Sequence, residues 1–267
     1  SECLVGSEMC IRDRLESNEE KLKKKTGGRK VHTTLAFVHT YPDGDRDFSF
    51  YRNPGADMML RKEEVSLEKI CASKIFHFGT LSFTHAGIRT ASQYAIQCAK
   101  EAGALISFDP NLREPLWENL EDARKAIEYG MECCDILKIS DNELTFMTGE
   151  KDYDKGAVLL QQKYQIPLVC VTLGKDGSRA YYKGLTIKAE PFLQKNTIET
   201  TGAGDTFTGC MLNTVLDKGL DNLTGEDIRG MLRFANAGAA LITTKRGALR
   251  VMPEKEEIEA LLEEQTE

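Results

Sequence analysis

Short apolar runs alternate with stretches of helical length through the middle of the chain. The runs lie at residues 75–78, 104–108, 136–139 and 168–173. Helices are expected between and after them, over about 85–102, 118–132, 141–148, 153–164, 205–218 and 225–244, and after Pro253. Strands that are apolar throughout and separated by helices are typical of a parallel sheet covered on both faces. The 267 residues suffice for one large α/β domain.

Residues 33–52 show a different pattern and are predicted to form a β-hairpin. The segment 33–38 is rich in β-prone residues, Pro42-Asp43-Gly44 is typical of a turn, and aromatic and polar residues alternate over 48–51. Polar residues on one face indicate a small sheet that is covered on one side only. We therefore expect a lid-like hairpin beside the main sheet.

Composition argues against several classes of protein. The net charge of −7 disfavours nucleic acid as the main partner. No apolar run approaches the length of a membrane span, so we expect no membrane partner. The eight cysteines lack the spacing of metal ligands, and several lie in apolar segments. A reducing cytoplasm is the compartment that this cysteine usage favours.

The beginning of the chain does not resemble the rest. Residues 7–14 resemble the translation of a sequencing adapter, so we expect residues 1–14 to be an artefact of sequence assembly. Residues 15–32 are polar and charged, and no structure is predicted for them. The fold is therefore sought in residues 33–267.

Polar segments follow three of the predicted strands. These segments are Asp109-Pro-Asn111-Leu-Arg113, Ser140-Asp-Asn-Glu143 and Thr172-Leu-Gly174-Lys-Asp-Gly177. Ligands of such sheets collect at the carboxyl ends of the strands. The three segments are therefore expected to meet at one edge of the sheet.

A glycine-rich turn, Gly202-Ala203-Gly204-Asp205, precedes the helix expected over 205–218. The free N–H groups of a helix start attract an anion, and a carboxylate beside them can take a proton from a hydroxyl. Phosphoryl transfer to an alcohol needs both. The turn is not a dinucleotide fingerprint, because Phe207 stands where glycine is required. A simple helix cap is the alternative.

The stretch Thr201-Gly-Ala-Gly-Asp-Thr-Phe-Thr-Gly209 resembles the C-terminal signature of the ribokinase-like sugar kinases, the PfkB family. The resemblance implies a three-layer α/β/α sandwich with a mainly parallel sheet and a small β lid. It implies that ATP and Mg²⁺ are cofactors and that Asp205 is the general base. Gly202, Ala203 and Gly204 would then form the anion hole.

The resemblance extends to the nucleotide side. It implies that Thr172, Gly174 and Gly177 lie against the nucleotide and Asn236 near the adenine. The alternatives are a hairpin turn at 172–177 and close helix packing around Asn236. A further segment, Arg246-Gly-Ala248, would close a loop for K⁺.

Ser140 and Glu143 occupy the family's N-x-x-E motif, with serine in place of asparagine. The resemblance implies that Glu143 organises Mg²⁺ through water and that Ser140 lies near the nucleotide. A capping box that starts a helix is the alternative, and both can hold at once.

Two segments, Asp109–Arg113 and Phe50–Asp57, resemble fructokinases more narrowly. They imply that Arg52, Asn111 and Arg113 face the substrate and that the reaction converts fructose to fructose 6-phosphate. A 2-dehydro-3-deoxygluconokinase is the nearest alternative. A truncated nucleotide-binding module without turnover is the alternative from another class.

The resemblance covers most of residues 33–250, but the family's first strand and its Gly-Gly-Asn segment are not seen before Thr33. Those segments carry sugar-binding residues, so we expect the chain as printed to be a poor kinase. A homodimer formed through the lid is a further expectation, because family members often pair there.

Overall fold

The computed structural model describes residues 31–40, 46–52, 55–247 and 249–264. The chain divides into two compact units, one of residues 1–105 and 111–127, the other of residues 106–110 and 128–267. The expected artefact at 1–14, the turn at 42–44 and almost all of segment 15–32 lie outside the described residues.

In the first unit, β1 (Leu35–Thr40) pairs antiparallel with β2 (Arg46–Tyr51), within the segment where the hairpin was predicted. The other elements of this unit are α3 (Leu67–Cys71), β3 (Ile75–Gly79) and α4 (Ala86–Glu101). Helix α4 lies close to its predicted bounds, and its buried residues recur at helical spacing. α3 was not predicted, because five residues carry too little periodicity. The helix α5 (Leu120–Cys133) runs from the first unit into the second.

Strands of the second unit lie in the order β4 (Leu105–Asp109), β5 (Ile136–Ser140), β6 (Leu168–Thr172), β7 (Ser178–Tyr182) and β8 (Leu185–Ala189). β4, β5 and β6 run parallel, whereas β7 and β8 are antiparallel to their neighbours. The parallel strands are those predicted from continuous apolar runs. β6 and β7 form an antiparallel hairpin, which is the alternative that the sequence offered for the loop at 172–177.

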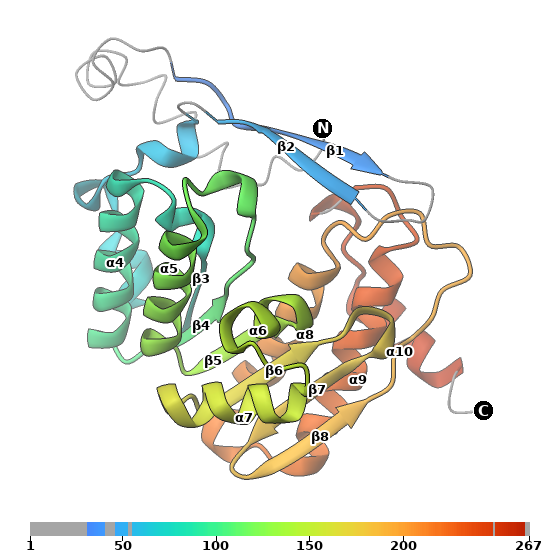
Figure 1. Cartoon of the computed structure of the whole chain (residues 1–267). Coiled ribbons are helices and arrows are strands. Elements are labelled where there is room, and N and C mark those ends of the chain that lie inside the picture. The colour runs from blue at the N-terminus through green and yellow to red at the C-terminus, as the bar shows by residue number, and fades with distance from the viewer. Residues whose placement is uncertain (1–30, 41–45, 53–54, 248, 265–267) are drawn as a thin grey trace. The chain divides into compact units, whose positions relative to one another are not determined.

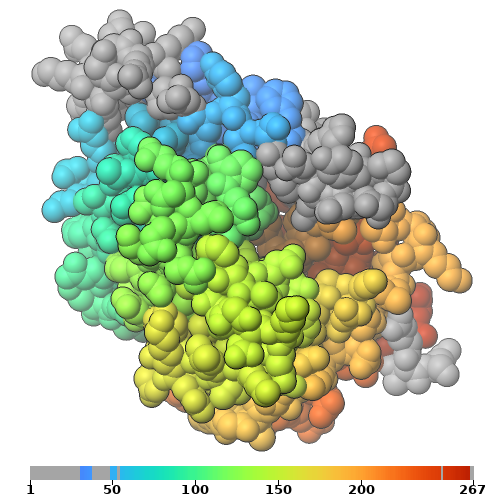
Figure 2. Space-filling view, viewed as in Figure 1, coloured from blue at the N-terminus to red at the C-terminus, as the bar shows by residue number. Residues whose placement is uncertain are grey.

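Helices cover the strands of the second unit on two sides (Figure 1). α6 (Asp141–Thr148) and α7 (Tyr153–Tyr164) pack on β5, β6 and β7. α9 (Gly225–Ile242) packs on β7 and β8 from behind in this view, and contacts α8 (Ala203–Lys218) and α10 (Lys255–Glu264). In the space-filling view, the side chains of α6 and α7, in lime and yellow, cover the front of these strands (Figure 2). The helix–sheet–helix layering implied by the resemblance is therefore present.

The core of the second unit explains the apolar runs. Residues 168–171 of β6 are fully buried, because helices lie on both faces of the strand. Gly238 of α9 lies where a Cβ would come within 3.0 Å of Cys210 Sγ and 3.1 Å of Ile258 Cδ1. A Cβ there would force these side chains to shift, so glycine favours the close approach of α9 to its neighbours.

Candidate active site

The glycine-rich turn starts helix α8, with Gly202 as its N-cap residue at φ +81°. Only glycine adopts that left-handed conformation readily. The N–H of Ala203 donates to Thr200 O at 3.2 Å. The N–H groups of Gly204 and Asp205 have no acceptor within the helix, because they lie in its first turn. The turn therefore presents backbone donors to an anion, beside the exposed Asp205.

A buried ion pair lies beside this turn. Lys138 of β5 donates from Nζ to Oδ2 of Asp109 at 3.0 Å, and the two residues are 7% and 5% exposed. The register of the parallel strands explains the contact, since Phe108 pairs with Leu137 and the next residues stand side by side. Asp109 begins one of the polar segments expected at this edge but was given no role of its own, and Lys138 was not among the predicted site residues. The sequence signal that could have identified the pair is a lysine inside an otherwise apolar strand, because a buried lysine needs a charged partner.

The charges of three carboxylates act on the ammonium of Lys138. Burial alone would lower the pKa of Lys138, but the charges of Asp109, Glu143 and Asp205 together with the hydrogen bond to Asp109 outweigh it and raise that pKa. Lys138 therefore stays protonated across the physiological range. One cation thus faces three acidic side chains at the carboxyl ends of β4 and β5 and the start of α8.

Gly204 lies close to this lysine. A Cβ on Gly204 would lie 3.2 Å from Nζ of Lys138 and 4.0 Å from its Cε. Gly204 has no positive φ, unlike Gly202. Glycine is therefore favoured at 204 because space is short, and not because of the backbone conformation. The turn and the ammonium thus approach each other closely.

Ser140 and Glu143 form a capping box at the start of α6. Ser140 N–H donates to Glu143 Oε2 at 2.9 Å, and Glu143 N–H donates to Ser140 Oγ at 3.4 Å. The capping alternative is thus realised in the structure. Glu143 is nevertheless buried near Lys138, so its carboxylate also belongs to the charged cluster.

The loop at 172–177 is the connection of the β6–β7 hairpin. Leu173 N–H donates to Gly177 O at 2.9 Å, which closes the turn. Gly174 and Gly177 have φ of +56° and +82°, and a Cβ on Gly177 would lie 2.2 Å from Ala189 O. Thr172 ends β6 opposite Ser140 of β5, so both stand at one edge of the sheet.

Asn236 is buried in α9 and holds the backbone after β8. Its Nδ2 donates to Ala189 O at 3.3 Å and to Glu190 O at 2.9 Å. These bonds favour the packing alternative for Asn236. They also fix the strand end against which Gly177 lies.

Arg52, in the first unit, is bound by its own neighbours. Its Nε donates to Asp57 Oδ2 at 2.6 Å, its Nη1 to Thr84 Oγ1 at 2.7 Å and its Nη2 to Leu81 O at 3.0 Å. The guanidinium therefore ties β2 to the segments around residues 57 and 81–84. This set of contacts favours a structural role.

Asn111 and Arg113 also belong to the first unit. Asn111 adopts φ 44°, a left-handed conformation that asparagine tolerates better than most residues. Arg113 donates from Nη1 to Leu112 O at 3.0 Å. Their role toward a substrate stays a prediction.

The loop expected to hold K⁺ is described only in part. Gly247 N–H donates to Glu199 Oε1 at 2.6 Å, and Ala248 lies outside the described residues. In the part of the chain that the structure describes, no group of three or more His, Cys, Asp or Glu side chains could hold a metal.

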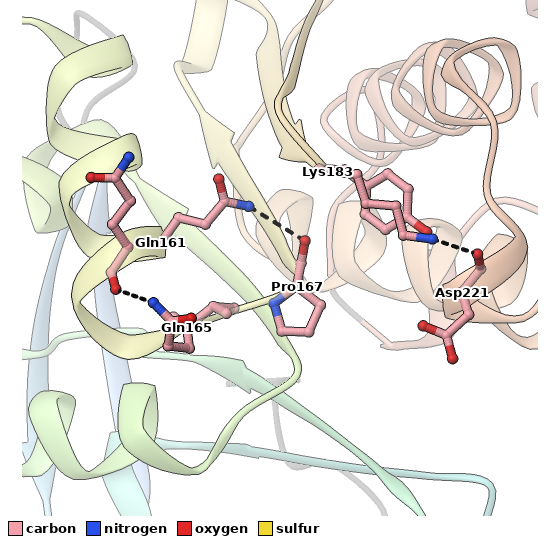
Figure 3. Close-up of a pocket in the computed structure, with 8 residues that line it drawn as sticks. Gln161, Gln165, Pro167, Lys183 and Asp221 are labelled. Atoms are coloured by element: carbon pink, nitrogen blue, oxygen red, sulfur yellow. Dashed lines mark hydrogen bonds between the residues drawn. The ribbon is translucent and has the colours of Figure 1, made fainter.

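A separate hollow of about 290 Å³ lies at the amino end of β6 (Figure 3). Its lining includes Pro167, Tyr182 and Lys183, whose Nζ donates to Asp221 O at 2.7 Å. The predicted site residues Ser140 and Thr172 stand instead at the carboxyl ends of their strands, where ligands of α/β sheets bind. This hollow is therefore not the predicted site.

A family model described as pfkB family carbohydrate kinase matches residues 24–255. The chain belongs to this family of carbohydrate kinases. The match includes the turn at 202–205, the loop at 172–177 and the Lys138–Asp109 pair. The resemblance that these motifs indicated is confirmed at the level of the family.

Curated relatives of this pfkB-family kinase are named as fructokinases. "Probable fructokinase-2" of Arabidopsis thaliana is 46% identical over 84% of this chain and 68% of its own length. "Fructokinase-2" of Solanum lycopersicum is 42% identical over 87% of this chain and 70% of its own. The chain thus spans about two thirds of the length of these relatives.

Solved structures confirm the ribokinase-like α/β fold of the kinase. A fructokinase with bound ATP from Xylella fastidiosa matches with TM-score 0.78 and 32% identity, over 88% of this chain and 74% of its own. A putative ribokinase II from E. coli, in complex with ATP and Mg²⁺, matches with TM-score 0.74 and 27% identity over 86% and 71%. A fructokinase double mutant from Vibrio cholerae, bound to fructose, ADP and a potassium ion, has TM-score 0.75 and 29% identity over 85% and 73%.

The six described cysteines are free thiols. Among the helices that the structure describes, none is long and apolar enough to span a membrane.

Proposed function

We propose that the protein transfers the γ-phosphoryl group of ATP to the primary 6-hydroxyl of D-fructose. The observation that carries the proposal is the turn at Gly202–Asp205, where a carboxylate stands beside backbone donors at the start of a helix. Fructokinase relatives, and the structures that contain ATP or fructose with ADP, support this choice of nucleotide and sugar.

In the proposed reaction, Asp205 accepts the proton of the sugar hydroxyl. The hydroxyl oxygen forms a bond to the γ-phosphorus, the bond from that phosphorus to the β–γ bridging oxygen breaks, and ADP leaves. The N–H groups of Gly204 and Asp205 and the positive end of the α8 dipole stabilise charge on the transferring group.

Mg²⁺ is proposed as the metal of the nucleotide complex. Bound Mg²⁺ would neutralise phosphate charge and keep much of its water shell. The buried carboxylate of Glu143 fits such an ion through water, since carboxylates are its preferred side-chain ligands. A K⁺ site near Glu199 and Gly247 is proposed by analogy with the fructokinase that binds potassium.

Thr172, Gly174, Gly177 and Ser140 are proposed to contact the nucleotide. Asn236 is proposed to act indirectly, by holding the Ala189–Glu190 backbone beside that loop. The proposed sugar-side residues remain Arg52, Asn111 and Arg113. Arg52 can bind the sugar only after it releases one of its present partners, Asp57 or Thr84.

A coupled assay tests the proposal on the protein expressed from its gene. ADP release is measured with fructose and with 2-dehydro-3-deoxygluconate, and a higher kcat/KM for fructose is expected. A preference for the keto-acid would replace fructose by the alternative substrate. ATP binding without turnover of either would favour a nucleotide-binding module.

A homodimer through the lid is also proposed. Leu35, Phe37 and Tyr51 of the β1–β2 hairpin are 42%, 61% and 52% exposed, and Leu35 pairs with Tyr51 across the two strands. Neighbouring exposed apolar side chains are typical of an interaction surface. Light scattering at micromolar concentration is expected to give twice the mass of one chain, and Phe37→Lys is expected to lower the measured mass to that of one chain.

A reducing cytoplasmic location is proposed from the cysteine usage.

A further inference from the structure

We infer that Lys138 is a further catalytic residue, whose ammonium, anchored by Asp109, binds the phosphoryl group as it passes the Gly202–Asp205 turn. The inference rests on the proposed function. Lys138 was not among the predicted site residues, and the observations that support the role are its burial, its unused donors and its place beside the turn.

Lys138 has more hydrogen-bond capacity than its surroundings use. An ammonium carries three N–H donors. Within the described part of the chain, Lys138 makes one hydrogen bond, to Asp109 at 3.0 Å, although its side chain is only 8% exposed. Buried donors are normally satisfied, so two open donors on a buried cation point to a ligand with several acceptor oxygens.

The open donors lie beside the proposed anion hole. The position of a Cβ on Gly204 would be 3.2 Å from Lys138 Nζ, which places the ammonium against the first turn of α8. The backbone N–H groups of that turn and the ammonium thus favour negative charge in the same place. A phosphoryl group is the anion of the proposed reaction that has enough oxygens to meet both.

The charge balance gives a reason for a cation here. The ammonium of Lys138 interacts electrostatically with the carboxylates of Asp109, Glu143 and Asp205. Without Lys138 this cluster would carry only negative charge. A phosphoryl group that approached such a cluster would be repelled. Lys138 lowers this repulsion in part and places positive charge at the turn, while Asp109 holds the ammonium in place.

Lys138 keeps its proton throughout the proposed step. The hydroxyl proton goes to Asp205, the new bond joins the sugar oxygen to the γ-phosphorus, and the electron pair of the broken bond stays with ADP. Lys138 contributes positive charge near the oxygens of the transferring group. The stabilisation that it provides increases as negative charge develops on those oxygens in the transition state.

The alternative is that Lys138 only neutralises Asp109. Lys138→Met alone cannot decide, because it leaves a buried carboxylate without its cation and risks unfolding. The double variant Lys138→Met/Asp109→Asn removes both charges and is expected to fold. If Lys138 binds the phosphoryl group, the folded double variant still loses kcat by about a hundredfold or more. Lys138→Arg in the wild-type background is expected to retain more activity than either.

Lys188→Met is the matched control. Lys188 also lies on a strand and pairs with an aspartate, Asp154, at 2.9 Å, but it is 55% exposed. Unchanged kcat is expected for this variant. The inference is wrong if the Lys138→Met/Asp109→Asn variant has a kcat within about threefold of wild type. Lys138 would then be only a structural partner of Asp109.

Calorimetry with ATP and with ADP gives a second readout that needs no sugar. If Lys138 contacts the γ-phosphoryl group, the double variant binds ATP about tenfold more weakly and ADP almost unchanged. Equal losses for both nucleotides would overturn the inference. If wild type binds ATP but phosphorylates neither sugar, the proposed function fails and this comparison still decides the role of Lys138. If wild type binds no ATP, both fail.

Discussion

Two charged clusters of the second unit are built in opposite ways. Around Asp154, one carboxylate accepts from Tyr181 Oη at 2.6 Å and pairs with Arg179 and Lys188, each at 2.9 Å. Around Lys138, one cation faces three carboxylates and makes a single described hydrogen bond. The first cluster is complete by itself, whereas the second has unused donors and excess negative charge. Completeness is typical of a structural cluster, and the unused donors of a buried cation indicate a place for a ligand.

Burial separates the two clusters in the same way. Asp154 has a side chain that is 38% exposed, and that of Lys138 is 8% exposed. Charges in water interact weakly, while charges in the interior interact strongly and cost much to leave alone. Changes at the Lys138 cluster are therefore expected to have large effects, and changes at the Asp154 cluster small ones.

The largest effect is expected from Asp205→Asn. The amide cannot accept the proton of the hydroxyl, so kcat is expected to fall by about 10² to 10⁴. ATP binding is expected to remain, because the backbone donors of the turn are unchanged. Steady-state kinetics and calorimetry check both parts. A variant that keeps more than about a tenth of the wild-type rate, a barrier change of only ~1.4 kcal/mol, would show that Asp205 is not the base.

Lys138→Met is expected to destabilise the fold by about 3–5 kcal/mol, because Asp109 is left buried without its cation. Urea unfolding measures this loss. Lys188→Met, at the half-exposed pair with Asp154, is expected to cost less than about 1 kcal/mol. Equal losses in the two variants would mean that burial does not distinguish the clusters.

Gly204→Val is expected to lower kcat by about tenfold or more while the protein stays folded. A side chain there would lie 3.2 Å from Lys138 Nζ and would displace the ammonium, and small displacements in a site cost much catalysis. Gly209→Ala in the same helix is the control, because a Cβ there meets nothing within 4 Å. It is expected to stabilise the helix by about 0.5–1 kcal/mol. Wild-type kinetics in Gly204→Val would place the turn away from the reacting groups.

The smallest effect concerns pH. Partial burial would raise the pKa of Asp154, but Tyr181, Lys188 and Arg179 outweigh it and lower that pKa to about 2, from the ordinary 3.8. The ionised carboxylate thus stabilises the fold above about pH 4, and this contribution is lost as the pH falls toward 2. Asp154→Asn is expected to flatten the acid side of a stability-against-pH curve slightly. An unchanged curve would contradict the lowered pKa.

Much of the fold was readable from local sequence. The helices α4, α6, α7 and α9 lie close to their predicted bounds, because apolar spacing and end signals are properties of neighbouring residues. The antiparallel end of the sheet was harder to predict. The run 185–189 was not predicted as a strand, since three of its five residues are exposed and its apolar pattern is weak.

The sequence by itself determined the family and the glycine-rich turn. Those depend on residues that are adjacent in the chain, and Gly202 meets its conformational requirement there without help from other elements. It also offered both interpretations of Ser140 and Glu143, because a capping box needs only residues three apart.

Only the tertiary structure decided the partners of charged groups. Asp109 and Lys138 are 29 residues apart and meet because parallel strands align them side by side. Arg52, which the sequence suggested for the substrate, is held by Thr84, 32 residues away. The reason is physical: electrostatic partners are set by distance in space and by burial, and neither is written in the spacing of residues along the chain.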